Sequence, residues 1–352
     1  MLDFLLTALL TIFLFGILIL VHELGHYLAA RKFKVGINEF AIGFGPKIFK
    51  KQGKYNLFSI RAFPIGGFVS MVGESEEVED EALKSTAFRS KPIWQRFIVA
   101  IAGSFMNVLL GLIVMAVLVS TQSVYASTTI AEFINTDETK SVSDLQGLQV
   151  GDQIIEVNGK KINVANDLVY AIMVDGIKPI NIVVIREGKK EILTIEFNQI
   201  TNQGTVFGDL DFKVARIEKT FGTVIHQTIY QSISNVDIVI SSLVDTLQGR
   251  FGIEGVSGPI GVGNAIGGAA KQPEAVRNVA SLFVTIALSL GIFNLLPIPM
   301  LDGGMIMFLI YEAIFKRRVP QKVEAALTMF FMMLLILLGI LVAFKDVFTI
   351  IK

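Results

Sequence analysis

The residues of this sequence that could most clearly do chemistry are His22, Glu23 and His26, in the pentad His-Glu-Leu-Gly-His. Histidines at positions i and i+4 of a helix lie about 40° apart around its axis and roughly one turn apart along it. Both imidazoles can therefore bind one metal ion, while the adjacent glutamate holds a water molecule beside the metal and accepts its proton. This arrangement is typical of zinc proteases.

The sequence around the pentad favours this interpretation over a chance match. The chain has three histidines in 352 residues, and two of them lie in the pentad. The third, His226, has no partner motif near it and is predicted to be an ordinary residue. The pentad also completes an apolar run that begins at Phe4 and is long enough to enter a bilayer. Ionisable side chains are costly at membrane depth, so they indicate a functional site.

The composition indicates an integral membrane protein. Hydrophobic residues make up 52% of the chain and charged residues 18%, and the mean hydropathy is +0.62. Soluble globular chains are usually less apolar and more charged. The formal net charge is zero, which gives no sign of nucleic-acid binding. Cysteine is absent, so disulfides and thiolate metal sites are excluded.

Four apolar segments are predicted to span the membrane. They lie in residues 1–30 with the pentad, 97–119, 279–315 with the Leu-Asp-Gly-Gly sequence, and 316–352 with a basic loop. The first segment is too long for a signal peptide and lacks a basic start. Lysines and arginines follow the first span and precede the fourth, so the positive-inside rule places residues 31–96 in the cytoplasm. Both termini and residues 120–278 are then extracytoplasmic.

The predicted cytoplasmic loop contains β-forming residues alternating with glycines from Ile37 to Met71, which indicates a β-hairpin or a short sheet. Its apolar content suggests that it re-enters the membrane. An open strand edge there could pair with an unwound substrate, with Gly66 and Gly67 as candidate substrate-binding residues. A purely structural hairpin is the alternative. The acidic run from Glu74 to Glu81 is predicted to be a solvated linker.

Two polar residues in other spans are candidates for the site. Asn107 lies inside the second span and needs a partner, either on a neighbouring helix or on a substrate backbone. Asp302 follows two prolines, Pro297 and Pro299, that break the third span on the same predicted side as the pentad. A zinc site with two histidines needs a third ligand if one position is to stay open for water. Asp302 is the predicted ligand, and a helix cap is the alternative.

The extracytoplasmic region is predicted to hold one small α+β domain at residues 120–212. Gly147–Ile162 has a Gly-Asp turn, an alternating strand and an Asn-Gly hairpin turn, and it resembles a PDZ domain. Such domains bind peptide ends or extended strands by edge addition. Residues 213–278 are predicted to form an amphipathic helix from about Phe221 to Leu247 and then a Gly-rich connector that is either flexible or a set of tight turns.

His-Glu-Leu-Gly-His in the first span, paired with Asn-Leu-Leu-Pro-Ile-Pro-Met-Leu-Asp-Gly-Gly in the third, resembles the site-2 protease family of intramembrane zinc metalloproteases. The resemblance covers nearly the whole chain. It implies zinc binding by His22, His26 and Asp302, catalysis by Glu23, and a substrate contact by Asn294. Two features depart from the family pattern: Ser104 stands where a proline is common, and one PDZ-like stretch is present where two often occur.

The predicted fold is therefore an α-helical integral membrane protein with four transmembrane helices, a membrane-reentrant β-hairpin or sheet, and one extracytoplasmic PDZ-like α+β domain. The predicted activity is that of a Zn2+-dependent endopeptidase in a bacterial inner (cytoplasmic) membrane. Its expected substrates are single-span proteins already trimmed outside, such as an anti-sigma factor, or remnant signal peptides. A membrane protein that binds partners without cleaving them and a zinc transporter are the alternative functions.

Overall fold

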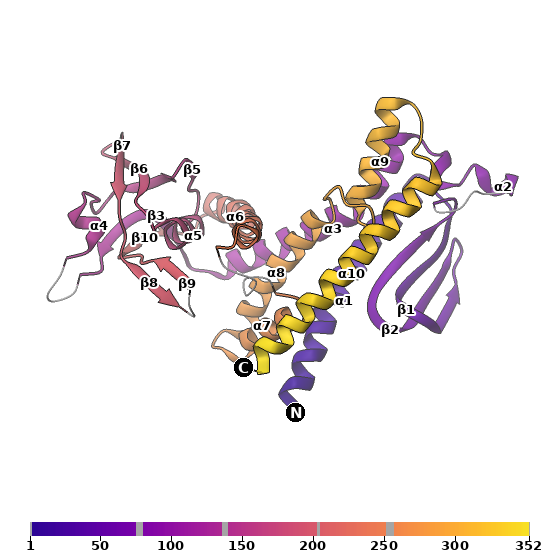
Figure 1. Ribbon diagram of the computed structural model, residues 1–352, viewed down its shortest axis with the longest axis horizontal. Coiled ribbons are helices and arrows are strands. Elements are labelled where there is room, and N and C mark those ends of the chain that lie inside the picture. The colour runs from indigo at the N-terminus through magenta and orange to yellow at the C-terminus, as the bar shows by residue number, and fades with distance from the viewer. Residues whose placement is uncertain (1, 75–79, 136–139, 203–204, 251–256, 352) are drawn as a thin grey trace. The chain divides into compact units, whose positions relative to one another are not determined.

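A computed structural model describes residues 2–74, 80–135, 140–202, 205–250 and 257–351. The chain forms two compact units (Figure 1). The first comprises Met1–Ile113 with Val256–Lys352, and the second comprises Val114–Gly255.

Four helices in the described part of the chain are long and apolar enough to cross a membrane. They are α1 (Leu2–Lys32), α3 (Ile93–Thr121), α8 (Ala275–Phe293) and α10 (Gln321–Ile351). The four predicted spans are thus confirmed as apolar helices. The predicted third segment, residues 279–315, covers two helices: α8 begins before it and ends at Phe293, and α9 follows from Asp302 to Phe315. These helices are consistent with a location in a membrane.

Glycines let the apolar helices of the first unit approach closely. A Cβ atom on Gly25 of α1 would lie 2.3 Å from the carbonyl oxygen of Ala102 on α3. A Cβ atom on Gly111 of α3 would lie 2.8 Å from the Leu288 side chain on α8. The contact at Gly25 requires glycine because the opposing atom belongs to the backbone, whereas a larger residue at position 111 would force the Leu288 side chain to move.

The segment predicted to be a hairpin or a short sheet contains β1 (Ile37–Gln52) and β2 (Leu57–Met71). Each strand bends back so that its two halves occupy different places in the sheet. Residues 39–42 pair with both 57–60 and 67–70, and residues 47–52 pair with 57–61. The order of segments across this small sheet is therefore 47–52, 57–61, 39–42 and 67–71. Gly43 and Gly45 have φ values of +86°, which side chains rarely adopt, and they lie where β1 bends. The segment at 67–71 forms an outer edge.

The chain between α8 and α9 (Asp302–Phe315) is not helical, as the two prolines predict. Backbone hydrogen bonds hold this connection together: Gly303 N–H donates to Asn294 O at 2.7 Å, and Gly304 N–H donates to Leu301 O at 2.9 Å. A Cβ atom on Gly303 would lie 2.1 Å from the carbonyl oxygen of Leu296. The Gly-Gly pair therefore lets α9 begin directly against the broken segment, with Asp302 as its first residue.

The prediction of a Gly-rich connector, either flexible or made of tight turns, is wrong for residues 259–271, which form α7 (Pro259–Lys271). Proline at the first helical position suits a helix start. The buried Asp346 carboxylate of α10 accepts hydrogen bonds from the backbone N–H groups of Gly258 and Gly261 at 2.9 and 2.8 Å. These contacts and close packing of Gly267 on Thr7 of α1 offset the low helix propensity of glycine. Residues 251–256 lie outside the described part.

The second unit contains a sheet of order β10-β3-β4-β6-β7, with β5 paired to β4, and a separate β8-β9 pair. The strands are β3 (Val124–Phe133), β4 (Gln153–Val157), β5 (Lys160–Lys161), β6 (Ile180–Arg186), β7 (Lys189–Ile195), β8 (Gln199–Asn202), β9 (Thr205–Gly208) and β10 (Phe212–Glu218). The helices are α4 (Val142–Leu145), α5 (Ala165–Asp175) and α6 (Phe221–Leu247), which matches the predicted amphipathic helix.

The core of this sheet domain includes Leu168 and Ile172 of α5 with Ile154, Ile182 and Ile195 of the strands. The predicted domain boundary at 212 is wrong, because residues 213–218 belong to β10 and pair with β3. Phe212 is itself part of the core. The last strand of the sheet therefore ends at Glu218, and α6 follows within the same unit.

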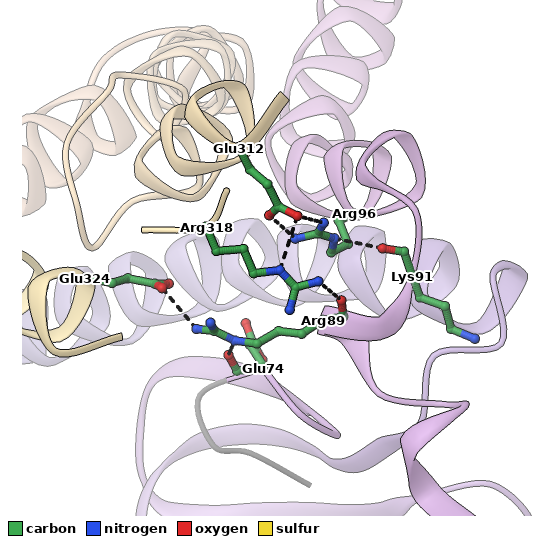
Figure 2. A network of polar contacts seen from close by, with 7 residues as sticks. All are labelled: Glu74, Arg89, Lys91, Arg96, Glu312, Arg318 and Glu324. Carbon is green, nitrogen blue, oxygen red and sulfur yellow. Dashed lines mark hydrogen bonds and ion pairs between the residues drawn. The ribbon is translucent and has the colours of Figure 1, made fainter. Parts of the chain in front are cut away.

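A polar network joins η1 (Phe88–Ser90) and the start of α3 to α9 and α10 (Figure 2). Arg96 donates to both carboxylate oxygens of Glu312 at 2.8 and 2.7 Å, and Arg318 donates to the same carboxylate at 3.2 Å. Arg89 donates to Glu324 of α10 at 3.0 Å. The hydrogen bond from Arg96 holds the pKa of the Glu312 carboxyl below its ordinary value.

Glu74 also belongs to this region, and it corrects the prediction of a solvated linker. Its backbone carbonyl accepts a hydrogen bond from Arg89 at 2.9 Å, and its side chain is partly buried. Burial raises the pKa of the Glu74 carboxyl. Residues 75–79 of the predicted linker lie outside the described part, and Glu81 begins α2 (Glu81–Lys84).

Replacing Glu312 with glutamine should destabilise the first unit, since it leaves the buried Arg96 guanidinium without its counter-ion. The expected loss is about 1–3 kcal/mol in the free energy of unfolding. Because the native pKa is lowered, this contribution is fully present above the ordinary glutamate pKa near 4.5 and is lost as the pH falls below it. Melting temperatures in detergent should therefore differ near pH 7 and converge as the solution is acidified.

Glu274→Gln is the matched control, because Glu274 pairs with Arg277 at an exposed position. Exposed pairs contribute little, so its melting temperature should equal that of the wild type. If the difference in melting temperature between the wild type and Glu312→Gln did not change with pH, that result would contradict the ion-pair explanation.

Candidate metal centre

Three side chains with metal-ligand atoms converge in the first unit. His22 and His26 lie one turn apart on α1, and Asp302 begins α9. Their ligand atoms all lie within 4.8 Å of one another. The Nε2 atoms of the two histidines are 3.1 Å apart, His22 Nε2 is 3.4 Å from Asp302 Oδ2, and His26 Nε2 is 3.4 Å from Asp302 Oδ1.

These separations fit a zinc ion. With bonds of about 2.0–2.2 Å in a tetrahedral site, neighbouring ligand atoms lie about 3.3–3.6 Å apart. The two histidine–aspartate separations fall in this range, and the 3.1 Å between the histidine nitrogens is slightly shorter. Two imidazole nitrogens and one carboxylate oxygen are ligands that zinc commonly takes, and three protein ligands leave the fourth position for water. All three side chains are largely buried, so a cation there would be held away from bulk solvent.

Helix α3 orients His26. Nδ1 of His26 lies 2.8 Å from the backbone carbonyl oxygen of Val99 and donates to it. A neutral imidazole with its proton on Nδ1 has its lone pair on Nε2, the atom that faces His22 and Asp302. Gly103, one turn further along α3, makes this approach possible, because a Cβ atom there would lie 2.3 Å from His26 Nε2.

Asn107 of α3 contacts the other histidine. Its Nδ2 is 3.4 Å from His22 Nδ1, while its buried Oδ1 has no hydrogen-bond partner among the described residues. The oxygen and nitrogen of an amide are assigned from the hydrogen-bond network. The reversed orientation gives His22 Nδ1–H an acceptor and leaves the Nε2 lone pair for a metal. Asn107 thus has a partner on a neighbouring helix, one of its two predicted roles.

Glu23 and the three ligand-type residues line one cavity of about 260 Å³. Its other lining residues include Asn294, Phe68, Val69, Glu74 and Met305. The edge segment of β2 passes beside Glu23: a Cβ atom on Gly67 would lie 3.3 Å from Glu23 Cγ, and Val69 lines the same cavity as Glu23. An acid or base at Glu23 therefore shares a cavity large enough for several water molecules with the candidate metal ligands.

Most residues singled out from the sequence lie in or beside this cavity. His22, Glu23, His26, Asn294 and Asp302 line it. Gly67 adjoins Glu23, and Asn107 lies behind His22. Gly66 does not line the cavity and packs against the Phe44 ring, where a Cβ atom would lie only 2.1 Å from a ring carbon.

Two groups at the site were not predicted from the sequence, the Val99 carbonyl and the Glu74 side chain. A backbone carbonyl carries no residue-type signal. Val99, Gly103 and Asn107 are spaced four residues apart on α3, so this spacing could have indicated that they share one face of the helix. Glu74 was missed because its acidic neighbours suggest solvent exposure.

Comparison with known proteins identifies the family. The family model described as "Peptidase family M50" matches residues 10–338. The chain belongs to peptidase family M50, the site-2 protease family. It is 34% identical to a protein of Fusobacterium nucleatum described as a zinc metalloprotease, over 97% of this chain and 98% of the relative.

Other relatives extend the comparison. The chain is 28% identical to the regulator of sigma-W protease RasP of Bacillus subtilis, over 97% of this chain and 98% of RasP. It is 27% identical to the metalloprotease MmpA of Caulobacter vibrioides, over 93% of this chain and 91% of MmpA. The protein is accordingly a metalloprotease whose cofactor is Zn2+.

Replacing Gly103 with alanine should abolish zinc binding, because the added Cβ would overlap His26 Nε2. The measurement is zinc per chain in detergent-purified protein. Gly339→Ala is the matched control, since Gly339 lies in the apolar helix α10 with nothing within 4 Å of an added Cβ. That variant should keep its zinc and gain up to about 1 kcal/mol of helix stability. A Gly103→Ala protein with a full complement of zinc would contradict this geometry.

Proposed function

We propose that this protein hydrolyses a peptide bond within or near the transmembrane segment of single-span membrane proteins. In this proposal His22, His26 and Asp302 bind the zinc ion, and Glu23 is the general base. The observation that carries it is the single cavity lined by these four side chains, three of which come from an apolar helix long enough to span a membrane. Membership of family M50 supports the same reaction.

The chemistry follows from the residue types. Zinc, when bound, supplies a Lewis acid that polarises oxygen atoms in the site. The Glu23 carboxylate accepts the proton of the attacking water and then delivers it to the leaving nitrogen of the peptide. The backbone N–H groups of the β2 edge and the buried walls position the extended peptide and limit access of other solvent to it.

The β2 edge is the proposed holder of the substrate. Peptide bonds within a helix are shielded by their own hydrogen bonds, so a transmembrane substrate must unwind locally before it is cut. In the pairing of the β1–β2 sheet, residues 67–71 lie at an outer edge, and they pass beside Glu23. Addition of the substrate as a further strand at this edge would satisfy its backbone groups next to the catalytic residues. The sheet enters the membrane in this proposal.

The proposed substrates are a pre-trimmed anti-sigma factor and, as a second group, remnant signal peptides. The name of the relative RasP, a regulator of sigma-W protease, supports the first. The proposed location is a bacterial inner (cytoplasmic) membrane with both termini outside, supported by Arg31 and Lys32 at the end of α1 and by basic residues before α10. Residues 31–96 and the loop before α10 then face the cytoplasm.

The sheet domain of the second unit is proposed to be PDZ-like. Its support is the Gly-Asp turn before β4, the Asn158-Gly159 turn after it, and the packing of α5 in the core. Strand β10 lies at one end of the sheet order. A peptide end or an extended flank of the substrate could bind at such an edge. In this proposal the sheet domain selects partners, and peptide hydrolysis takes place in the first unit.

Glu23→Gln tests the proposal. The variant keeps the size of the side chain but cannot accept a proton, so cleavage of a tagged single-span anti-sigma-type substrate in membranes should fall by at least about a hundredfold. Zinc content should stay at the wild-type level, because Glu23 is not a proposed ligand. A chelator should also abolish cleavage by the wild type, and added Zn2+ should restore it.

Glu274→Gln, at an exposed site outside the cavity, should cleave like the wild type. Equal cleavage by wild type and Glu23→Gln would refute the assigned base. Zinc bound at full occupancy with no cleavage of any tested membrane substrate by the wild type would favour a transport or storage function instead.

A further inference from the structure

Ser104 touches the proposed metal ligand Asp302. It lies on α3 next to Gly103 and is fully buried. Its hydroxyl donates a hydrogen bond to Asp302 Oδ2 at 2.9 Å. Within the described part of the chain, the recorded polar side-chain partners of Asp302 are His22, His26 and Ser104. Ser104 is thus the one non-ligand partner among them.

The hydroxyl of Ser104 forgoes the bond that such residues usually make in a helix. Serine and threonine in apolar helices commonly donate to the carbonyl four residues earlier. Several hydroxyls in this protein do so: Thr11, Ser232, Thr246 and Thr285. The recorded partner of Ser104 is instead Asp302, which is 198 residues away in the sequence. Asp302 therefore competes successfully with the local carbonyl for this donor.

The Asp302 carboxylate needs orientation from outside its own helix. It is the first residue of α9, and the preceding residue, Leu301, provides no side-chain cap. The backbone there is fixed by the hydrogen bonds of Gly303 and Gly304, but these do not restrain rotation of the carboxylate. A neutral donor on one oxygen stabilises the ionised form in a buried place and fixes the plane of the group.

The same helix thereby contacts all three candidate ligands. The carbonyl of Val99 binds His26, Ser104 binds Asp302, and Asn107 lies against His22. We infer that Ser104 is a positioning residue for the metal centre, which orients Asp302 and raises the affinity of the site for Zn2+. This inference rests on the proposed ligand set of His22, His26 and Asp302. It adds a role for a residue outside that set.

The test is the zinc dissociation constant of detergent-purified protein, measured by competition with a chromophoric chelator. Ser104→Ala should raise this constant about 10- to 100-fold, the usual effect of losing a partner that orients a metal ligand. Ser104→Thr keeps the hydroxyl and should stay within about threefold of the wild type. In Co2+-substituted protein the visible absorption should change for Ser104→Ala and not for Ser104→Thr.

Ser289→Ala is the matched control. Ser289 lies in the neighbouring helix α8, and its buried hydroxyl has no recorded hydrogen-bond partner among the described residues. Removing it should leave the zinc dissociation constant unchanged. Metal-free Ser104→Ala should melt no more than a few degrees below metal-free Ser289→Ala, the loss expected for one hydrogen bond, which separates a role at the metal from a general loss of folding.

Each outcome bears on the inference. A dissociation constant for Ser104→Ala within about threefold of the wild type would overturn it. Equal weakening in Ser104→Thr, or a metal-free Ser104→Ala protein that melts well below the control, would overturn it in favour of a packing role. A wild-type protein that binds no zinc would refute the proposed metal site itself, whereas normal zinc binding with an unaffected Ser104→Ala refutes only the role of Ser104.

Discussion

The close approach of α3 to one face of α1 is the constraint on which the rest of the first unit depends. Gly25 contributes a bare backbone from one helix and Gly103 from the other, and a Cβ atom on either would lie 2.3 Å from an atom of the opposite helix. At this separation the polar groups of α3 reach the buried imidazoles of His22 and His26. Buried polar groups are costly unless they are hydrogen-bonded, so this contact makes a polar site possible inside an apolar bundle.

The second requirement is a carboxylate delivered to the same place from the far end of the sequence. The prolines between α8 and α9 interrupt the helix, and the bond from Gly303 N–H to Asn294 O folds the chain so that α9 starts at the cavity. The ion pair between Glu312 and Arg96 fixes α9 to the start of α3. The helix that orients the histidines therefore also restrains the element that carries Asp302.

The sequence was sufficient to predict elements with a strong local signal. The apolar runs predict their helices, the i, i+4 histidines predict a shared face, and the prolines predict the break before Asp302. The sequence could not show the tertiary contacts between residues that are distant along the chain. The folding of β1 and β2 into four paired segments depends on bends at glycines whose conformation is set by the sheet. The glycine content of α7 suggests a flexible segment, but contacts with Asp346 and Thr7, both distant in the sequence, stabilise it as a helix. The partial burial of Glu74 also depends on contacts with distant residues, while its acidic neighbours in the sequence suggest solvent exposure.

The most direct test of the central claim is the position of the cut. Purified protein and a single-span anti-sigma-type substrate would be reconstituted together in lipid vesicles, and the product masses determined by mass spectrometry. A zinc protease acting at the cavity beside the β2 edge should give two fragments whose masses sum to that of the substrate plus one water, with the cut inside or next to the substrate's membrane-spanning segment. Cleavage confined to a soluble flank far from that segment would contradict the account.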